Sequence, residues 1–292
     1  MFSRGRETTV RWLIAFAFVS SAWAQEVEVL LPTGTGVSMV LIPAGEFPMG
    51  AAEGAADQQP VHPVELKAFY IDKYEVTNAQ YREYMRDTGY HPPFIWREGD
   101  DYNAPEQPVM DINWFEMQQY CNWAGKRLPA EAEWEKAARG TDGRRNPWGD
   151  EEPNANGEYR ANYNDAGDRD ADGFTFSAPV GSYPQGVSPY GVHDMVGNAK
   201  EWVGDWYDKD YYTTSPRQDP TGPEIGQLKV IRGGSWFDFG RFAYGTYRVG
   251  FNPELPDGDI GGRCAVNADS PLVAQTAVEG VSWGGIKAEL AE

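Results

Sequence analysis

The feature that most constrains the fold is a long stretch without clear periodicity. From Thr141 to about Gln227 the helical and strand patterns are much weaker than in the segments on either side. Ordered loops of such length are uncommon and are usually functional or held by ligands. The chain also carries 33 glycines, 21 prolines and 11 tryptophans, spread throughout. We therefore expect one domain dominated by turns and irregular segments, with aromatic side chains filling its core.

The first 24 residues have the pattern of a secretory signal. Arg4, Arg6 and Arg11 precede or begin the short apolar run WLIAFAFV, and Ala22-Trp23-Ala24 supplies the small residues of a cleavage site. The apolar run is far shorter than the roughly 20 residues of a spanning helix. We expect cleavage before Gln25, with an uncleaved anchor as the alternative. No later segment is apolar enough to span a bilayer, so the mature chain is expected to be periplasmic or secreted.

The charge balance excludes one class of partner. The chain has a formal net charge of −19 at pH 7, and removal of the basic signal makes it more negative. A chain without excess lysine and arginine cannot track a phosphate backbone, so we expect no nucleic-acid partner. An acidic surface fits solubility and cation binding.

The two cysteines, Cys121 and Cys264, favour a disulfide in an oxidising compartment. Such a bridge would close a long loop and contribute about 4 kcal/mol through the entropy of the unfolded chain. No second pair remains for redox chemistry or a thiolate zinc site.

Local patterns predict several elements outside the loop region. EVEVLL and SMVLIPAGEF are typical of strands, with a turn at residues 43–45, and VELKAFYIDKYEV is strand-like. Thr77 and Gln80 form a capping-box pattern for a helix that Gly89 ends. A second helix is predicted after Asn113, ending at Gly125. A third follows KRL, with Pro129 in its first turn and its end at residue 140.

Two places in the loop region are rich in oxygen ligands. In ANYNDAGDRDADGF, Asp168, Asp170 and Asp172 alternate before a glycine, but Pro179 stands where an EF-hand needs its closing glutamate. A bent calcium loop and a solvated acidic turn both remain open at this point. In HDMVGNAKEW, Asp194 and Glu201 flank a glycine that permits a sharp bend, which on chemistry alone is a weak signal.

Several segments in order resemble the formylglycine-generating enzyme, or sulfatase-modifying factor, family. They are MVLIPAGEFPMG, YEVTNAQYREYM, CNWAGKRLPAEAEWEKAARG, NPWGDEEPNANGEYRANY, YGVHDMVGNAKEWVGDWY, VIRGGSWF and GGRCA. The resemblance implies a mixed α/β, C-type-lectin-like fold with little regular secondary structure. It divides the chain into a signal (1–24), an N-terminal segment (25–36), the domain (37–268) and a tail (269–292). It also implies that Cys121 and Cys264 pair, as in family members.

The resemblance implies up to two structural calcium ions. The first would lie on side-chain and carbonyl oxygens of Asn162, Tyr163, Asp172 and Phe174. The second would lie on Asp194, Gly197, Ala199 and Glu201, with Asp194 replacing the usual asparagine.

The resemblance also argues against the family's best-known chemistry. Its namesake enzymes oxidise a substrate cysteine with two copper(I)-binding cysteines that follow the GGS motif. Aligned on Gly233-Gly234-Ser235, these positions hold Asp238 and Ala243, neither of which is the soft ligand that copper(I) requires. We therefore expect no copper and no formylglycine generation. The iron-dependent sulfoxide synthases of the family use a histidine cluster, whereas His62, His91 and His193 are scattered here.

The segment IRGGSWFDFGRFAYGTYR still marks the expected pocket. Its candidate residues are Ser235, Trp236, Asp238, Arg241, Tyr244 and Arg248. No motif places a base beside Ser235, so a nucleophilic serine is not expected. Aspartate–arginine pairs in such a segment more often form structural salt bridges.

Two classes of function remain. The first is a monomeric accessory or maturation factor that binds a protein or a peptide-derived molecule, as implied by relatives in bacterial secretion and signalling systems. The second is a tailoring enzyme with non-thiol chemistry, as implied by an exported cysteine-lacking relative that matures the pyoverdine chromophore. The tail beyond residue 268 could pack on the domain or serve in docking.

Overall fold

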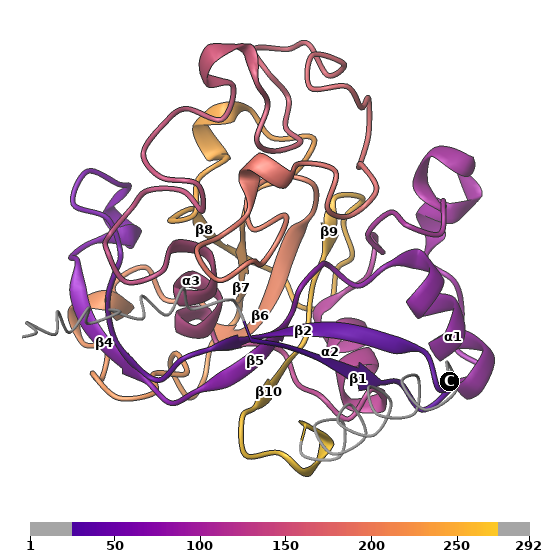
Figure 1. Cartoon of the computed structure of the whole chain (residues 1–292), viewed down its shortest axis with the longest axis horizontal. Coiled ribbons are helices and arrows are strands. Elements are labelled where there is room, and N and C mark those ends of the chain that lie inside the picture. Colours follow the sequence, from indigo (N-terminus) through magenta and orange to yellow (C-terminus); the bar gives the residue numbers. More distant parts are fainter. Residues whose placement is uncertain (1–24, 274–292) are drawn as a thin grey trace, which may run out of the picture.

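The computed structural model describes residues 25–273 (Figure 1). The expected signal, and the tail from residue 274 onward, lie outside these residues. Within them, no helix has both the length and the apolar character needed to cross a membrane. Two four-stranded sheets and one two-stranded hairpin form the framework.

The first sheet joins the beginning of the domain to its end. Its strands are β1 (Glu26–Leu30), β2 (Gly36–Ile42), β5 (Phe69–Asp72) and β10 (Ala265–Asn267), in that order and all antiparallel. The expected strand EVEVLL is β1, and each of its residues pairs with β2. The boundary placed at residue 37 therefore falls inside this sheet.

The hairpin and the second sheet complete the strand framework. Strand β3 (Gly45–Met49) pairs with β4 (His62–Leu66). The strand-like segment VELKAFYIDKYEV thus divides between β4 and β5, which belong to different sheets. The second sheet has the order β8 (Arg248–Phe251), β7 (Lys229–Arg232), β6 (Lys200–Trp206) and β9 (Ile260–Gly261), and only β6 and β9 are parallel.

Strand β6 corrects the prediction that residues 141–227 are loops. It is the longest strand of the second sheet, and Trp202 and Val203 on it are completely buried. Charged side chains, Glu201 and Asp205, are buried on it as well. Because a strand buried on both faces does not alternate apolar and polar residues, periodicity could not reveal it. Much of the region before β6 forms the loops at the top of the view in Figure 1, whereas the segment after β6 runs beside β4, where Gln218 bridges to Glu65.

The three predicted helices are present. Helix α1 (Asn78–Thr88) begins with the capping box of Thr77 and Gln80 and ends at Gly89. Helix α2 (Trp114–Trp123) is capped by Asn113, and α3 (Glu131–Arg139) ends at Gly140. The prediction that Pro129 lies in the first turn of α3 is wrong, because Pro129 comes just before the N-cap of this helix. Short 3-10 turns occupy Ala56–Gln58, Phe94–Arg97, Asp100–Tyr102, Ala155–Gly157, Pro184–Gly186, Tyr211–Thr213 and Gly240–Phe242.

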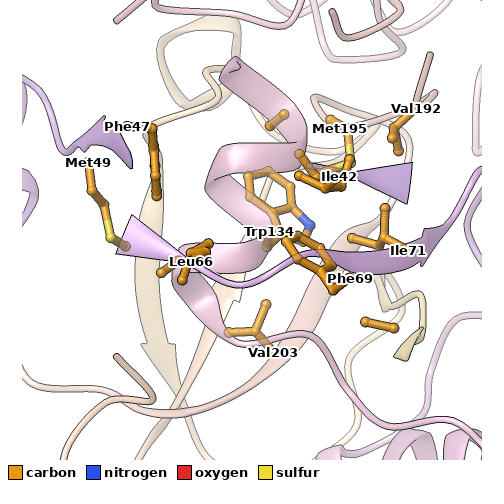
Figure 2. Packing of buried hydrophobic residues seen from close by; sticks show 14 of the residues in the cluster. Ile42, Phe47, Met49, Leu66, Phe69, Ile71, Trp134, Val192, Met195 and Val203 are labelled. Atoms are coloured by element: carbon orange, nitrogen blue, oxygen red, sulfur yellow. The ribbon is translucent and has the colours of Figure 1, made fainter. Parts of the chain in front are cut away.

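The main core is built around Trp134 of α3. Its ring is completely buried and lies among apolar residues from both sheets, the hairpin and the loops, including Ile42, Phe47, Leu66, Phe69, Ile71, Met195 and Val203 (Figure 2). Its indole nitrogen donates to Glu201 at 2.9 Å. A buried tryptophan needs such a partner, so this bond fixes α3 against β6.

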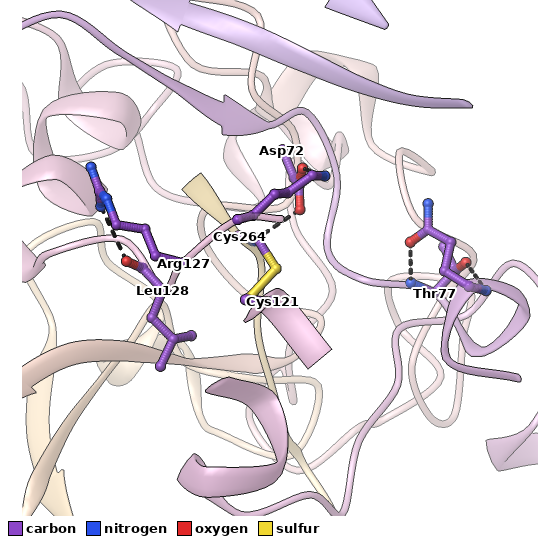
Figure 3. Close-up of a disulfide and its surroundings, with 8 residues drawn as sticks. Asp72, Thr77, Cys121, Arg127, Leu128 and Cys264 are labelled. Carbon is purple, nitrogen blue, oxygen red and sulfur yellow. Dashed lines mark hydrogen bonds and ion pairs between the residues drawn. A yellow bond between two sulfur atoms is a disulfide. The ribbon is translucent and has the colours of Figure 1, made fainter. Parts of the chain in front are cut away.

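The predicted disulfide is present. Cys121 of α2 is bonded to Cys264, with 5.6 Å between the Cα atoms (Figure 3). Both cysteines are completely buried. The backbone N–H of Cys264 also donates to Asp72 at 2.9 Å, which connects the bridge to the end of β5. The two sequence-distant halves of the domain are thereby linked.

Candidate functional site

The connection between β7 and β8 folds back sharply at two glycines. Gly233 and Gly234 have φ angles of 92° and 71°. A Cβ atom on Gly234 would lie 2.7 Å from the carbonyl oxygen of Phe242, so the close approach requires glycine. The predicted pocket residues after this turn lie in two groups: Ser235, Trp236 and Asp238 are packed among other side chains, whereas Arg241, Tyr244 and Arg248 line a cavity.

Ser235 and Asp238 belong to a closed charge cluster with Lys200 and Asp259. Nζ of Lys200 lies 3.0 Å from Oδ2 of Asp238 and 2.7 Å from Oδ2 of Asp259. The hydroxyl of Ser235 donates to the same oxygen of Asp259 at 2.6 Å. Burial opposes the charge on Lys200, but the two carboxylates outweigh it and raise the pKa of the lysine. A protonated lysine is no general base for Ser235, and its charge is balanced by the two carboxylates that also accept the hydroxyl of Ser235.

Trp236 and the neighbouring Ala243 are packing residues. Trp236 is buried, and its ring centroid lies 5.2 Å from that of Phe176. Ala243 is completely buried in a cluster with Ala161, Tyr163 and Val196. Neither residue lines the cavity, and the buried indole nitrogen of Trp236 has no hydrogen-bond partner within the described chain.

The second group lines a cavity of about 810 Å³. Its opposite wall is the loop from Gly50 to Val61, and the end of α3 forms part of its floor. We call it the arginine cavity, because four arginines line it: Arg139, Arg145, Arg241 and Arg248.

Two of the four arginines are committed to ion pairs with α3. Nε and Nη2 of Arg248 donate to the two carboxylate oxygens of Glu131 at 2.7 and 2.9 Å. Arg139 pairs with Glu135, which also binds Arg232 at 2.6 Å. Burial opposes ionisation of Glu135, yet the guanidinium groups of Arg139 and Arg232 hold its pKa below the ordinary value. The charges of these two arginines are therefore already balanced, and the acids Glu53, Asp57 and Asp150 also line the cavity.

The other two arginines lie at the exposed edge of the cavity. The guanidinium carbon of Arg145 lies 3.4 Å from the ring centroid of Tyr244, and its ion pair with Glu152, at 3.3 Å, is solvent-exposed. Arg241 contacts the ring of Phe242 and makes no ion pair with any residue between 25 and 273. Both guanidinium groups are thus accessible to a ligand with carboxylate oxygens.

The first predicted calcium loop surrounds a carboxylate without a counter-charge. The N–H groups of Tyr163 and Phe174 donate to the two oxygens of Asp172 at 2.7 and 3.1 Å. The amide of Asn162 donates to the carbonyl of Phe176. Burial raises the pKa of Asp172 to about 6, and no lysine or arginine of the described chain pairs with it. The structure thus joins three of the predicted ligands, Tyr163, Asp172 and Phe174, by hydrogen bonds, whereas Asn162 bonds to Phe176.

In the second predicted calcium loop, an arginine side chain already pairs with one of the carboxylates. Arg263 binds Glu201 with both guanidinium edges, at 2.7 and 2.8 Å. Oδ2 of Asp194 accepts the N–H of Gly181 at 2.6 Å, and burial raises its pKa to about 6. A third buried carboxylate, Glu75, accepts the N–H of Ala199 at 2.9 Å. The predicted ligands are adjacent, but Glu201 is already paired.

A metal site made of side chains alone is absent from residues 25–273, since nowhere do three or more His, Cys, Asp or Glu converge to hold an ion. The three histidines lie apart, each against a tyrosine ring: His62 on Tyr212, His91 on Tyr90 and His193 on Tyr74.

Sequence reasoning missed the partners that α3 supplies. Glu131, Glu135 and Arg139 are spaced i, i+4 and i+8, so they share one face of the helix, and all three are buried. Charged residues on the inner face of a helix were the available signal for a buried ion-pair network. Lys200 and Asp259 had no comparable signal, because they meet only through the pairing of distant segments.

The model of the FGE-sulfatase family, described as "Sulfatase-modifying factor enzyme 1-like domain", matches residues 27–268. The chain belongs to the FGE-sulfatase family. It is 37% identical to the formylglycine-generating enzyme of Streptomyces coelicolor, over 79% of this chain and 89% of that one. It is 30% identical to the inactive C-alpha-formylglycine-generating enzyme 2 of Bos taurus, over 89% and 96%.

Similar proteins also include a kinase and two bacterial proteins of known structure. The serine/threonine-protein kinase pkn1 of Chlamydia pneumoniae is 37% identical over 78% of this chain, which spans only 38% of the kinase. Among solved structures, PvdO from Pseudomonas aeruginosa aligns with a TM-score of 0.68 and 27% identity, covering 83% of this chain and 99% of that one. Treponema denticola variable protein 1 has the same fold, with a TM-score of 0.68 and 22% identity.

Proposed function

We propose that this FGE-sulfatase domain is an exported, monomeric accessory or maturation factor that does not generate formylglycine. The observation that carries the proposal is the use of both cysteines, Cys121 and Cys264, in one disulfide. At the two positions that follow the GGS motif, Asp238 is paired with Lys200 and Ala243 is buried. Neither side chain is a soft ligand for copper(I).

Similarity to a relative named as inactive also supports the proposal that this domain does not generate formylglycine. One similar protein, from Bos taurus, carries the word "inactive" in its name and aligns over most of both chains. A member of this fold can therefore serve without the namesake reaction, and the site rather than the fold decides the function.

The arginine cavity is the proposed binding site, and its ligand is a protein segment or a peptide-derived molecule. Its volume of about 810 Å³ is within the range of small-ligand sites. Arg145, stacked on Tyr244, and Arg241 would bind carboxylate oxygens of the ligand. Because the chain has a net charge of −19, its overall electrostatic field would not attract a carboxylate ligand. The attraction would come from these two arginines at the edge of the cavity.

Copper chemistry is tested directly with a cysteine-containing sulfatase peptide and added copper. We expect the peptide mass to stay unchanged, whereas conversion of its thiol to an aldehyde would overturn the proposal. Binding is tested by capturing ligands from a cell-envelope extract and identifying them by mass spectrometry. Wild-type protein should retain a peptide or protein that the Arg145→Ala/Arg241→Ala variant loses. Equal retention by the two would place the binding site elsewhere.

Calcium is the proposed structural cofactor, and the first loop fits it well. Asn162 and Asp172 supply side-chain oxygens, and the carbonyls of Tyr163 and Phe174 complete an oxygen-only set of the kind calcium prefers. The cation would also balance a buried carboxylate. At Asp194, Gly197, Ala199 and Glu201 the fit is poorer, because calcium would share Glu201 with Arg263.

A chelator should lower the melting temperature, and excess calcium should restore it. Saturation at about 100 times Kd corresponds to about 2.7 kcal/mol of added stability. Asp172→Asn should abolish the response, whereas the neighbouring Asp168→Asn should retain it. A response that survives Asp172→Asn but disappears in Asp194→Asn would assign the ion to the second loop, and no response in the wild type would remove both sites.

The alternative function is a tailoring enzyme with non-thiol chemistry, for example in the maturation of a siderophore chromophore such as that of pyoverdine. The structural similarity to PvdO, with 99% of that chain covered, favours this candidate. The capture experiment separates the two, because a binding factor releases its ligand with unchanged mass and an enzyme releases a modified one.

A further inference from the structure

A second cavity, of about 620 Å³, lies at the N-terminal end of α3. Its walls come from the loop after β4, the start of α3, the end of β6, residues 219–221 and residues 267–269. It shares no lining residue with the arginine cavity, so the two are separate sites. We call it the Asp205 cavity.

Asp205, on β6, carries the only side chain of this cavity that is at once charged and almost completely buried, with 3% of its surface exposed. Its Oδ2 accepts the backbone N–H of Glu131, at the start of α3, at 2.8 Å. In the described part of the chain, no donor bonds Oδ1 and no basic side chain forms an ion pair with Asp205. One oxygen of a buried carboxylate is therefore available.

The nearby lysine, Lys229, is occupied elsewhere. Its Nζ donates to the carbonyl of Gly204 at 2.6 Å. The same nitrogen lies 4.1 and 3.9 Å from the ring centroids of Trp114 and Trp206, which hold it between two aromatic faces. Burial raises the pKa of Asp205 to about 8, as expected for a carboxyl group without a close cation.

The walls of the cavity combine apolar surface with an acidic edge. Leu66, Ala68, Leu128, Ala130, Pro220 and Ala268 supply the apolar surface. The two basic lining residues are paired with acids, Lys67 with Asp219 and Arg127 with Glu133. This pairing leaves Asp205 and Asp269 as the acids without a basic partner among residues 25–273.

We propose that the Asp205 cavity binds a primary ammonium group on an aliphatic chain, as in a lysine side chain or a free diamine. The ammonium donates to Oδ1 of the ionised Asp205, so the proton that this buried carboxyl holds near neutral pH leaves to solvent when the amine binds. The aliphatic chain lies along the leucine and alanine walls. A guanidinium group fits less well, because its two-pronged pairing needs both carboxylate oxygens and Oδ2 is taken by Glu131. A divalent cation fits less well again, because it needs six or more oxygen ligands.

Binding is tested by titration calorimetry with Nα-acetyl-lysine amide and with 1,5-diaminopentane. The matched controls are the Nε-acetylated form of the lysine probe, which keeps the shape without the charge, and Nα-acetyl-arginine amide. We expect both amines to bind, with affinity reduced at least tenfold by acetylation and by the change to arginine. If only the diamine binds, the source is a free amine; if the lysine probe binds as well, a polypeptide side chain is accepted. Binding of neither amine to the wild type would overturn the proposal.

Two variants locate the site. Asp205→Asn keeps an acceptor for Glu131 while removing the charge, and it should reduce affinity at least tenfold. Asp219→Asn, at the edge, should change affinity less than about threefold. Ala268→Phe fills the cavity from a half-buried position and should abolish binding even if Asp205→Asn does not fold. Binding that survives both Asp205→Asn and Ala268→Phe would overturn the proposal. This result is independent of the ligand captured at the arginine cavity, since no residue is shared.

Discussion

Buried carboxylates beside α3 are balanced in two different ways. Glu131 and Glu135, on one face of the helix, are bound by Arg248, Arg139 and Arg232 in a closed network that borders the arginine cavity. At the N-terminal end, Asp205 receives one backbone N–H and no cation from the described chain. The helix dipole favours an anion at this end, but by only about 0.3–1 kcal/mol. The desolvation of a carboxylate costs several kcal/mol, so Asp205 remains unbalanced.

This contrast teaches where a ligand is to be sought. A charge that the fold has already paired is part of the framework, however close it lies to a cavity. A charge that the fold has buried without a partner is available to a ligand, and Asp172 in the first calcium loop belongs to this second kind. Arginine-lined and acid-lined cavities therefore differ in how much of their charge is free, and substitutions at each end of α3 can measure that difference.

The largest effect is expected from breaking the closed network. Glu135→Gln leaves Arg139 and Arg232 with less negative charge in a fully buried site, so it should cost about 3–5 kcal/mol in the free energy of unfolding. Urea denaturation measures the loss. The control, Glu152→Gln, affects only exposed interactions, the pair with Arg145 and a bond from Tyr244, and should cost less than about 1 kcal/mol. Similar losses for the two variants would show that burial does not distinguish these pairs.

The second effect depends on pH and comes from Asp205. Asp205 has an ordinary pKa of 3.8 and a folded pKa of about 8. Between these values the folded state binds more protons than the unfolded state, so this group makes stability fall as pH rises from about 4 to about 8. Glu131 and Glu133 strengthen the shift and Lys229 opposes it, but burial is the main cause.

The stability difference between wild type and Asp205→Asn should therefore depend on pH. Its slope should approach about 1.4 kcal/mol per pH unit in that window, with the variant gaining on the wild type as pH rises. Urea denaturation at several pH values measures the slope. Parallel pH profiles for the two proteins would mean that Asp205 already has a counter-charge, and its contrast with the paired glutamates of α3 would disappear.

The smallest effect is expected at the edge of the Asp205 cavity. Glu133 forms a two-pronged pair with Arg127 at 2.6 and 2.7 Å, but this pair is partly exposed. Glu133→Gln should cost about 0.2–1 kcal/mol. A loss in stability as large as that of Glu135→Gln would contradict the idea that burial sets how much each ion pair of α3 contributes to stability.

The sequence predicted those parts of the fold that depend on neighbouring residues. The caps at Thr77 and Asn113 specify where α1 and α2 begin, because each cap acts over a few residues. The family motifs supplied the fold class and the disulfide. Strand β6 escaped detection because burial on both faces erases alternation, and the pairing of Lys200 with Asp259 depends on contacts between distant segments.

The candidate site was predicted less completely for a similar reason. The pocket residues are close in sequence and all follow the turn at Gly233 and Gly234. Asp238 nevertheless pairs with Lys200, whereas Arg241 lines the arginine cavity. Asp205 carried no recognisable motif. Its potential role arises from the lack of a basic partner, which only a three-dimensional structure can show.

The position of β10 has a consequence for how the chain is made. Strand β10 and Cys264 close the first sheet and the disulfide, yet they belong to the last part of the domain to leave the ribosome or a translocation channel. Until then β5 has an unpaired edge and Cys121 has a free thiol. A chain that stops before residue 264 therefore exposes both a strand edge and a reactive sulfur, which gives quality-control proteases and thiol oxidoreductases a direct means to recognise an unfinished molecule.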